Sequence, residues 1–154
     1  MKRETLSLKK ASSAEVQLRD EATLDAPAGT ETVLVVDDEP LVLRLCCTIL
    51  SRQGYRVLGA PSPDEALRLS AEESRKVQLL LSDIIMPRVR GTDLAERISK
   101  IVPGIRVLYM SGFDGREIPE YEMLRRTAKL ISKPFTPRDL LKAVRAALDK
   151  PPGL

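Results

Sequence analysis

Five residues of the sequence have side chains suited to phosphoryl chemistry, and each stands where an apolar run ends. Asp37 and Asp38 follow the first run, and three later runs lead to Asp83, Ser111 and Lys133. Because the carboxyl ends of parallel strands meet at one edge of a sheet, we expect these side chains to form one acidic pocket with one buried cation. Such a pocket suits metal-assisted phosphoryl transfer.

The carboxylates of this expected pocket repel one another, so the pocket needs a compensating cation. Mg²⁺ is the natural candidate, because it takes oxygen ligands and often binds one or two carboxylates together with phosphate oxygens. An Asp carboxylate beside the ion can attack phosphorus and form an acyl phosphate. Taken singly, each residue could instead belong to a solvated turn, a loop cap or the charged surface. Their shared place at strand ends favours the functional interpretation.

Short strands that alternate with helices must position these residues. From Thr32 onward, β-rich runs are separated by stretches of helical periodicity, which is typical of βα units and a parallel sheet. We predict strands at about 32–36, 55–60, 78–82, 105–110 and 129–132, and helices at about 40–52, 63–74, 91–101, 115–125 and 137–148. The apolar first and third strands predict an α/β fold with helices on both faces of the sheet.

The domain organisation follows from a change of pattern near residue 30. Residues 1–29 lack apolar periodicity and are interpreted as a flexible tail or linker, followed by a domain at 30–150 and a C-terminal tail at 151–154. The sequence has neither a signal-peptide core nor an apolar run long enough to span a membrane. We therefore expect a cytoplasmic protein.

The composition excludes several kinds of site. The sequence has no His, which rules out a Ser-His-Asp triad, His-ligated metals and a phosphohistidine carrier, so any metal must be held by oxygen. A net charge of +3 and the absence of Trp argue against a nucleic-acid surface. Cys46 and Cys47 are adjacent, which suits neither an ordinary disulfide nor zinc, and we expect at least one in a helix core.

Four separated motifs resemble the receiver domain of two-component response regulators. They are VLVVDDEP at 33–40, DIIMPRVRG at 83–91, Met110-Ser111-Gly112 and Lys133-Pro134-Phe135, in the order and spacing of that family. The resemblance covers about residues 31–150. It implies a doubly wound, flavodoxin-like (βα)5 fold, a three-layer sandwich with parallel strand order 2-1-3-4-5.

The resemblance implies a role for each residue that would meet the phosphoryl group. Asp83 resembles the phosphoacceptor, and Ser111 and Lys133 would contact the phosphoryl oxygens. In the family the peptide before the proline that matches Pro134 is commonly cis, which would aim Lys133 into the pocket. The phosphoryl donor would be a histidine kinase or a histidine phosphotransfer protein.

The same resemblance implies a set of Mg²⁺ ligands. Asp38 and Asp83 would bind the ion directly, and Asp37 would bind it through water. The backbone carbonyl of Ile85 would complete the ligands that the protein supplies.

The chain departs from the family pattern at three positions. Many receivers have an aromatic switch residue three positions before the lysine, where this chain has Leu130, so movement of Ser111 and of residues 112–124 would have to carry the signal. Ile85 and Phe113 occupy positions that help set how fast water reaches the acyl phosphate. Neither side chain can orient a water by hydrogen bonding, and we therefore predict slow dephosphorylation.

Several readings of the whole protein stay open. Because residues 149–154 leave no room for an output domain, we expect a stand-alone receiver that signals to a protein effector through the 115–132 region, without contacting nucleic acid or a membrane. A homodimer is compatible with this reading. The alternatives are the terminal receiver of a hybrid sensor kinase, a phosphatase of the haloacid dehalogenase type, and a pseudo-receiver that acts without phosphorylation.

Overall fold

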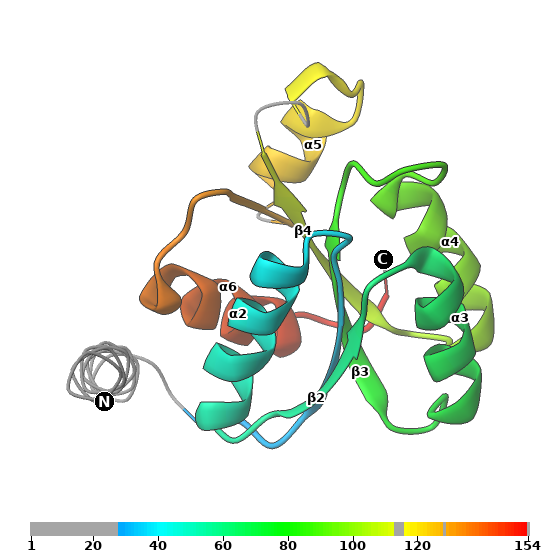
Figure 1. Ribbon diagram of the computed structural model, residues 1–154, viewed down its shortest axis with the longest axis vertical. Helices are drawn as coiled ribbons and strands as arrows, with labels where there is room; N and C mark the ends of the chain where they lie inside the picture. Colours follow the sequence, from blue (N-terminus) through cyan, green and yellow to red (C-terminus); the bar gives the residue numbers. More distant parts are fainter. Residues whose placement is uncertain (1–27, 113–115, 128, 154) are drawn as a thin grey trace, which may run out of the picture.

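The computed structural model describes residues 28–112, 116–127 and 129–153, where five strands alternate with five helices (Figure 1). The strands are β1 (Thr32–Val36), β2 (Arg56–Ala60), β3 (Val77–Asp83), β4 (Arg106–Ser111) and β5 (Leu130–Ser132). The helices are α2 (Pro40–Arg52), α3 (Pro63–Glu72), α4 (Gly91–Ile101), α5 (Tyr121–Arg126) and α6 (Pro137–Asp149). The predicted tail at 1–29, apart from its last two residues, lies outside the described residues.

The strands form one parallel sheet in the order β2-β1-β3-β4-β5, which confirms the predicted doubly wound topology. The chain winds from β1 to β2 on one side and from β3 to β5 on the other, so the strand order reverses between β1 and β3. These two strands end nearly level, because Val36 pairs with Ser82. Open α/β sheets bind ligands beyond such a reversal point, and Asp37, Asp38 and Asp83 lie there.

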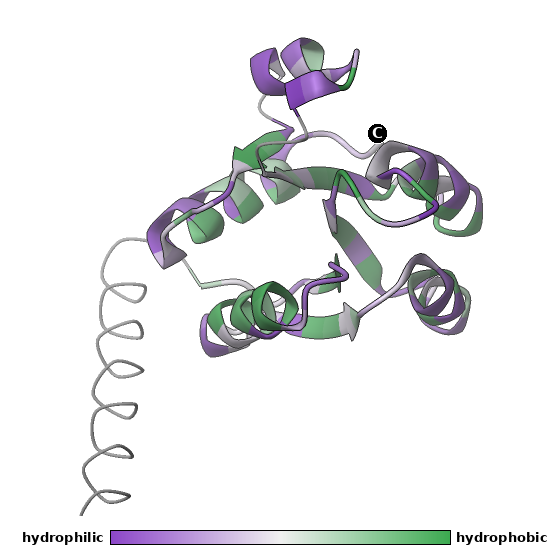
Figure 2. Cartoon of the chain, turned by 45° about the horizontal axis from the view of Figure 1, so that its top comes forward, coloured by the Kyte–Doolittle hydropathy of each residue, from purple (hydrophilic) through white to green (hydrophobic). Residues whose placement is uncertain are grey.

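Two hydrophobic clusters cover the two faces of the sheet, since successive side chains of a strand point to opposite sides. Val33 and Val35 pack with α2 and α6, whereas Leu34 and Val36 pack with α3 and α4. Figure 1 shows these helix pairs on opposite sides of the sheet. In Figure 2 mostly hydrophobic strands lie between helices of mixed hydropathy. The prediction of a helical core cysteine is confirmed, because Cys46 is fully buried on α2.

The start of α6 is fixed by a capping box immediately after the Lys133 segment. The Thr136 hydroxyl oxygen accepts the backbone N–H of Asp139 at 3.1 Å, and the Asp139 carboxylate accepts the backbone N–H of Thr136 at 3.2 Å. Pro137 occupies the first helical turn, where a missing N–H costs nothing. The sequence pattern therefore sets where the lysine-bearing loop ends.

The predicted helix at 115–125 is wrong in its extent. Helix α5 begins only at Tyr121, and residue 115 lies outside the described residues. Pro119 explains the later start, because proline has no N–H and disfavours the helical conformation of the residue before it. The other predicted elements agree with the structure within two residues at each end. In the part of the chain that the structure describes, no helix is long and apolar enough to cross a bilayer.

Candidate functional site

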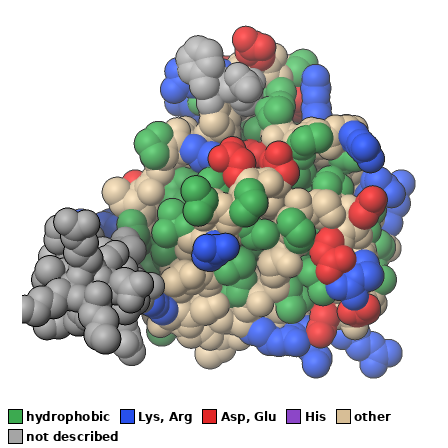
Figure 3. Space-filling model, in the orientation of Figure 1, with side chains coloured by type: hydrophobic (Ala, Val, Ile, Leu, Met, Phe, Trp, Pro, Cys, Tyr) green, Lys and Arg blue, Asp and Glu red, His purple; other side chains and the backbone are tan. Residues whose placement is uncertain are grey.

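The structure brings three of the predicted carboxylates together at the carboxyl edge of the sheet. Asp37 and Asp38 follow β1 and Asp83 ends β3, and one oxygen of each lies within 4.8 Å of the others. Asp37 and Asp83 are buried, at 0% and 6% exposure, whereas Asp38 is exposed. Figure 3 shows acidic side chains gathered in the upper middle of one face, with hydrophobic side chains around them.

The Lys133 ammonium bridges the two buried carboxylates. Its Nζ lies 2.8 Å from Oδ2 of Asp37 and 3.4 Å from Oδ1 of Asp83. The backbone N–H of Lys133 donates to the Ser111 carbonyl at 2.8 Å, which ties the end of β5 to the end of β4. The Lys133–Pro134 peptide is cis. The predicted cation thus reaches the acidic pocket from the end of the edge strand β5.

Both carboxylate oxygens of Asp37 have donors. Oδ1 accepts the backbone N–H of Glu39 at 2.9 Å, and Oδ2 accepts the Lys133 ammonium. Glu39 also places Oε1 4.0 Å from Nζ of Lys133, although its side chain is 64% exposed. Asp37 is therefore the most constrained acid of the pocket, which fits contact with a metal through water rather than by direct ligation.

The Ser111 hydroxyl donates to the backbone and not to the carboxylates. Ser111 is 2% exposed at the end of β4, and its Oγ donates to the Gly112 carbonyl at 3.0 Å. The structure therefore places this residue at the predicted edge without joining its hydroxyl to the acidic group. Donation to a phosphoryl oxygen would require the hydroxyl to give up its hydrogen bond to Gly112.

Backbone contacts hold the loop that follows Asp83. The N–H of Ile84 donates to the Met110 carbonyl at 2.9 Å, and the N–H of Gly91 donates to the Ile84 carbonyl at 2.8 Å. Ile85 forms an isolated bridge across the loop. A Cβ on Gly91 would lie 2.3 Å from the Asp83 carbonyl oxygen, so only glycine fits this close approach. The loop thereby fixes the position of both Asp83 and the Ile85 backbone.

Burial and the neighbouring carboxylates both oppose ionisation of Asp83. Burial raises the pKa of Asp83 to about 6, and the charge of Lys133 only partly opposes this rise, while Asp37 and Asp38 add to it. Burial alone would lower the pKa of Lys133. The hydrogen bond to Asp37 and the nearby carboxylate charges nevertheless raise it overall. A hard cation with oxygen ligands fits this donor set.

Comparison with known proteins agrees with this geometry. The family model described as the response regulator receiver domain matches residues 33–145. The chain belongs to the response regulator receiver family. Receiver domains are signalling phosphoacceptor modules of two-component systems, and the match disfavours the phosphatase that the sequence had left open.

Two similar proteins come from Brucella abortus (strain 2308). The response regulator receiver protein CpdR is 31% identical over 116 residues, which cover 75% of this chain and 95% of CpdR. The sensor kinase CckA is 32% identical over 146 residues, which cover 92% of this chain but only 15% of CckA. The chain also spans about half the length of the similar SaeR response regulators.

Solved structures show the same fold. A response regulator receiver domain protein from Clostridium thermocellum superposes with a TM-score of 0.66 at 28% identity, covering 77% of this chain and 94% of that one. The receiver domain of the hybrid histidine kinase CckA gives 0.62 at 27% identity, covering 77% and 99%. These likenesses confirm the flavodoxin-like (βα)5 architecture.

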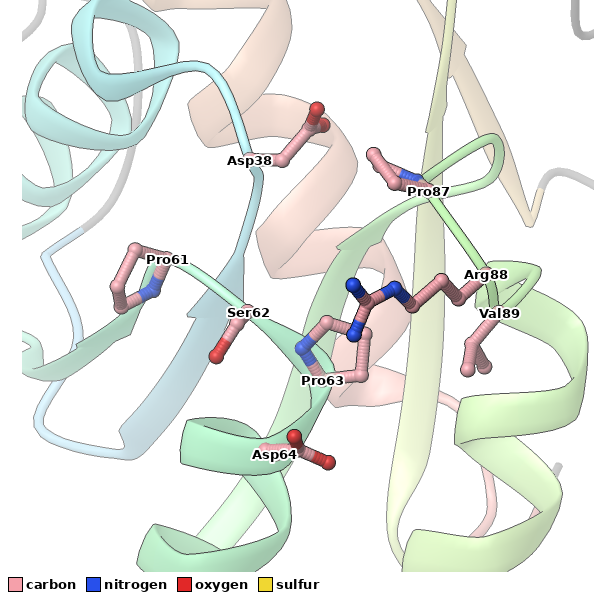
Figure 4. Close-up of a pocket in the computed structure, with 8 residues that line it drawn as sticks. All are labelled: Asp38, Pro61, Ser62, Pro63, Asp64, Pro87, Arg88 and Val89. Carbon is pink, nitrogen blue, oxygen red and sulfur yellow. The ribbon is translucent and has the colours of Figure 1, made fainter.

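Two further features beside the acidic residues were not predicted. Helix α2 leaves Leu41 and Leu45 exposed, at 76% and 40%. A cavity of about 290 Å³ opens beyond Asp38, between residues 61–64 and 87–89. Figure 4 shows the Arg88 side chain reaching across this cavity, and the Arg88 backbone has a φ of 72°. Leu41 and Leu45 lie one helical turn apart. The sequence did not predict their exposure, because apolar residues occur on every side of α2.

Proposed function

We propose that this receiver takes a phosphoryl group onto Asp83 from the phosphohistidine of a histidine kinase or phosphotransfer protein. One observation carries the proposal. Asp37, Asp38 and Asp83 converge within 4.8 Å, and Lys133 lies 2.8 Å from Asp37 and 3.4 Å from Asp83. The match to the receiver family supports the same role for these residues.

In the proposed reaction an oxygen of Asp83 attacks phosphorus while the bond between phosphorus and the donor nitrogen breaks. The bonding electron pair leaves with the imidazole, and Asp83 becomes an acyl phosphate. Bound Mg²⁺ would neutralise charge on the transferring group and keep the Asp83 carboxylate ionised. The Lys133 ammonium would donate to one phosphoryl oxygen. The Ser111 hydroxyl would exchange its hydrogen bond to the Gly112 carbonyl for one to another phosphoryl oxygen.

The proposed Mg²⁺ ligands differ in exposure and in how many hydrogen bonds their carboxylate oxygens already accept. Asp38 is exposed and Asp83 ends β3 beside it, so these two carboxylates suit direct ligation. Asp37 already accepts two hydrogen bonds and suits ligation through water. The Ile85 carbonyl would complete the protein ligands from the fixed loop after β3.

The signal would leave through the face formed by residues 115–132, of which 115 and 128 lie outside the described residues. Helix α5 exposes Met123 at 59% on this face. Leu130 pairs with Tyr109 across β4 and β5, so the strand that carries Ser111 also touches this region. Movement of Ser111 would therefore reach the proposed effector surface without an aromatic residue at 130.

Intact-mass measurement after incubation with Mg²⁺ and acetyl phosphate tests the proposal. The wild type should gain one phosphoryl mass, and Asp83→Asn should gain none. Asp64→Asn is the matched control, because Asp64 is an exposed acid on the neighbouring α3 and should leave labelling unchanged. Labelling that survives Asp83→Asn, or its absence in the wild type, would contradict the assignment.

The hybrid-kinase reading has one observation in its favour. The similarity to CckA extends over 146 residues, 33 more than the 113 positions that the family model spans from residue 33 to 145. The similarity to CpdR, which this chain covers almost completely, favours a stand-alone receiver instead. Immunoblotting of the native protein separates the two, since a stand-alone chain should migrate near 17.1 kDa.

A further inference from the structure

In the part of the chain that the structure describes, one buried side-chain oxygen has no hydrogen-bond partner. It is Oε2 of Glu120, the residue that immediately precedes α5. Such oxygens are uncommon in proteins, because removing a charged acceptor from water without giving it a donor costs free energy. Any movement that brings a donor to this oxygen is therefore favourable.

A hydroxyl group without a partner lies close to Glu120. Tyr109 on β4 is 6% exposed, and its hydroxyl forms no hydrogen bond with any residue that the structure describes. Its side chain packs in the same hydrophobic cluster as Ile118 and Leu124, which flank Glu120 in the sequence. Burial raises the pKa of Tyr109 to about 12, and the negative charges of Glu120 and Asp93 add to this rise. The Glu120 carboxylate is therefore near enough to act on the phenol.

Tyr109 is connected to the acidic site along β4. Side chains two positions apart on a strand point to the same face of the sheet, so Tyr109 and Ser111 share the face covered by α3 and α4. The backbone N–H of Tyr109 donates to the Lys129 carbonyl at 2.8 Å, and the N–H of Lys129 donates to the Leu124 carbonyl at 2.9 Å. A displacement at the end of β4 therefore reaches both Tyr109 and α5.

We propose that the Tyr109 hydroxyl donates a hydrogen bond to Oε2 of Glu120 in the phosphorylated protein, and that this bond carries the signal from Ser111 to α5. The inference rests on the proposed phosphorylation of Asp83. When the Ser111 hydroxyl exchanges its bond to the Gly112 carbonyl for one to a phosphoryl oxygen, the end of β4 shifts and moves Tyr109. The new bond then satisfies a donor and an acceptor that the described residues leave without partners.

Burial favours Glu120 over Asp93 as the acceptor. Asp93 is exposed on α4, where water solvates its carboxylate, whereas Oε2 of Glu120 is buried. A hydrogen bond is electrostatically stronger where the surroundings are less polar than water. Because Glu120 immediately precedes α5, the bond fixes the start of the helix that exposes Met123 on the proposed effector surface. This route needs no aromatic residue at position 130.

NMR of the full chain labelled with ¹³C at the tyrosine Cζ atoms tests the proposal, with the intact mass measured on the same sample. The chain has three tyrosines, and Tyr109→Phe identifies the Tyr109 signal. This signal should shift when Mg²⁺ and acetyl phosphate label the wild type. Glu120→Ala should gain the same phosphoryl mass but lose the shift. Asp93→Ala is the matched control, because it removes the other carboxylate that acts on the phenol, and it should keep the shift.

The possible failures are distinguishable. A gain of phosphoryl mass without a shift of the Tyr109 signal would overturn this inference and leave the proposed function standing, whereas no gain of mass would contradict both. A shift that Asp93→Ala removes as fully as Glu120→Ala would exclude Glu120 as the acceptor. Should Glu120→Ala lose the native spectrum, Tyr109→Phe serves instead, because it removes only the hydroxyl. The amide shifts of Tyr121 and Leu124 on phosphorylation should then be lost, and their persistence would overturn the proposal.

Discussion

The three carboxylates of the acidic pocket differ in how many contacts they already make. Both oxygens of Asp37 accept hydrogen bonds, and Asp83 shares the Lys133 ammonium at 3.4 Å. Asp38 is exposed beside them. The proposed roles of water-mediated ligand, phosphoacceptor and direct ligand follow this order of constraint. The Lys133 ammonium thus contacts two of the three carboxylates.

Lys133→Gln should destabilise the protein in EDTA. Removing the ammonium leaves Asp37 and Asp83 buried without their shared cation, and breaking a buried ion pair from one side costs about 3 kcal/mol. Mg²⁺ should then raise the free energy of unfolding more in the variant than in the wild type, because the emptied pocket attracts the ion more strongly. Urea unfolding with and without Mg²⁺ measures both effects. An equal Mg²⁺ response in the two proteins would contradict this role.

Ile85→Gln should accelerate loss of the phosphoryl group from the labelled protein. The amide could orient an attacking water, and one hydrogen bond worth about 1 kcal/mol corresponds to roughly a fivefold faster decay. Val89→Gln is the matched control, since Val89 lies in the same loop and, like Ile85, packs against the hydrophobic cluster on the α3 and α4 face of the sheet. Decay of the intact phosphoprotein mass provides the rate. Phe113, the other position of the slow-decay prediction, lies outside the described residues.

Among the elements, α2 combines a buried face with an exposed one next to the acidic pocket. Cys46, Ile49 and Leu50 pack in the core, whereas Leu41 and Leu45 are exposed near the helix start. A donor protein that delivered its phosphohistidine to Asp83, as proposed, would bring its surface close to this helix. Exposed large apolar side chains beside a reactive residue suit such a contact.

Leu41→Ala should slow phosphorylation by a histidine phosphotransfer protein that labels the wild type, while labelling by acetyl phosphate stays unchanged. Truncating an apolar interface residue costs about 1 kcal/mol or more, which is roughly a fivefold effect. Met123→Ala is the control, because Met123 is 59% exposed on α5 rather than on α2. If both variants, or neither, slow the protein donor, α2 is not the docking element. Because Leu41 is 76% exposed, its loss should leave stability almost unchanged.

Some elements were predictable from the sequence because their signals are local. The runs that lead to Asp37 and Asp83 are buried on both faces, so unbroken apolar residues marked both the strands and the sheet edge. The predicted start of α5 was too early, because Pro119 delays the α-helix until Tyr121. The direction of the Ser111 hydroxyl and the exposed face of α2 depend on packing between distant elements. No spacing within the sequence encodes them.

Across the whole molecule, the beginning of the described domain is tied to its last helix. The two guanidinium nitrogens of Arg145 lie 3.1 and 2.5 Å from the two oxygens of Glu31, which is 114 positions away in the sequence. Arg145 also donates to the Tyr55 hydroxyl at 3.3 Å. The ring of Tyr55 packs so closely on Gly29 that a Cβ there would lie 2.0 Å from it. This cluster fixes where the segment before β1 meets α6.

Glu31→Gln should therefore reduce stability at neutral pH but not in strong acid. The hydrogen bond from Arg145 lowers the pKa of Glu31 from 4.5 to about 2, against the opposing effect of burial. A carboxyl with a depressed folded pKa contributes stability above its unfolded value of 4.5, and loses that contribution as the pH falls towards 2. Since solvent screens this partly exposed pair, we expect a difference of about 1 kcal/mol at pH 7.

Urea unfolding of both proteins at pH 7, 4 and 3 measures this difference, which should shrink steadily as Glu31 takes up its proton. Glu122→Gln provides the matched control, because Glu122 pairs with Arg125 at 3.0 Å on the exposed surface of a single helix. Its removal should change stability little at any of these pH values. A Glu31→Gln deficit that stays constant down to pH 3 would mean that the side chain acts by packing, and that the ion pair does not join the two ends of the domain.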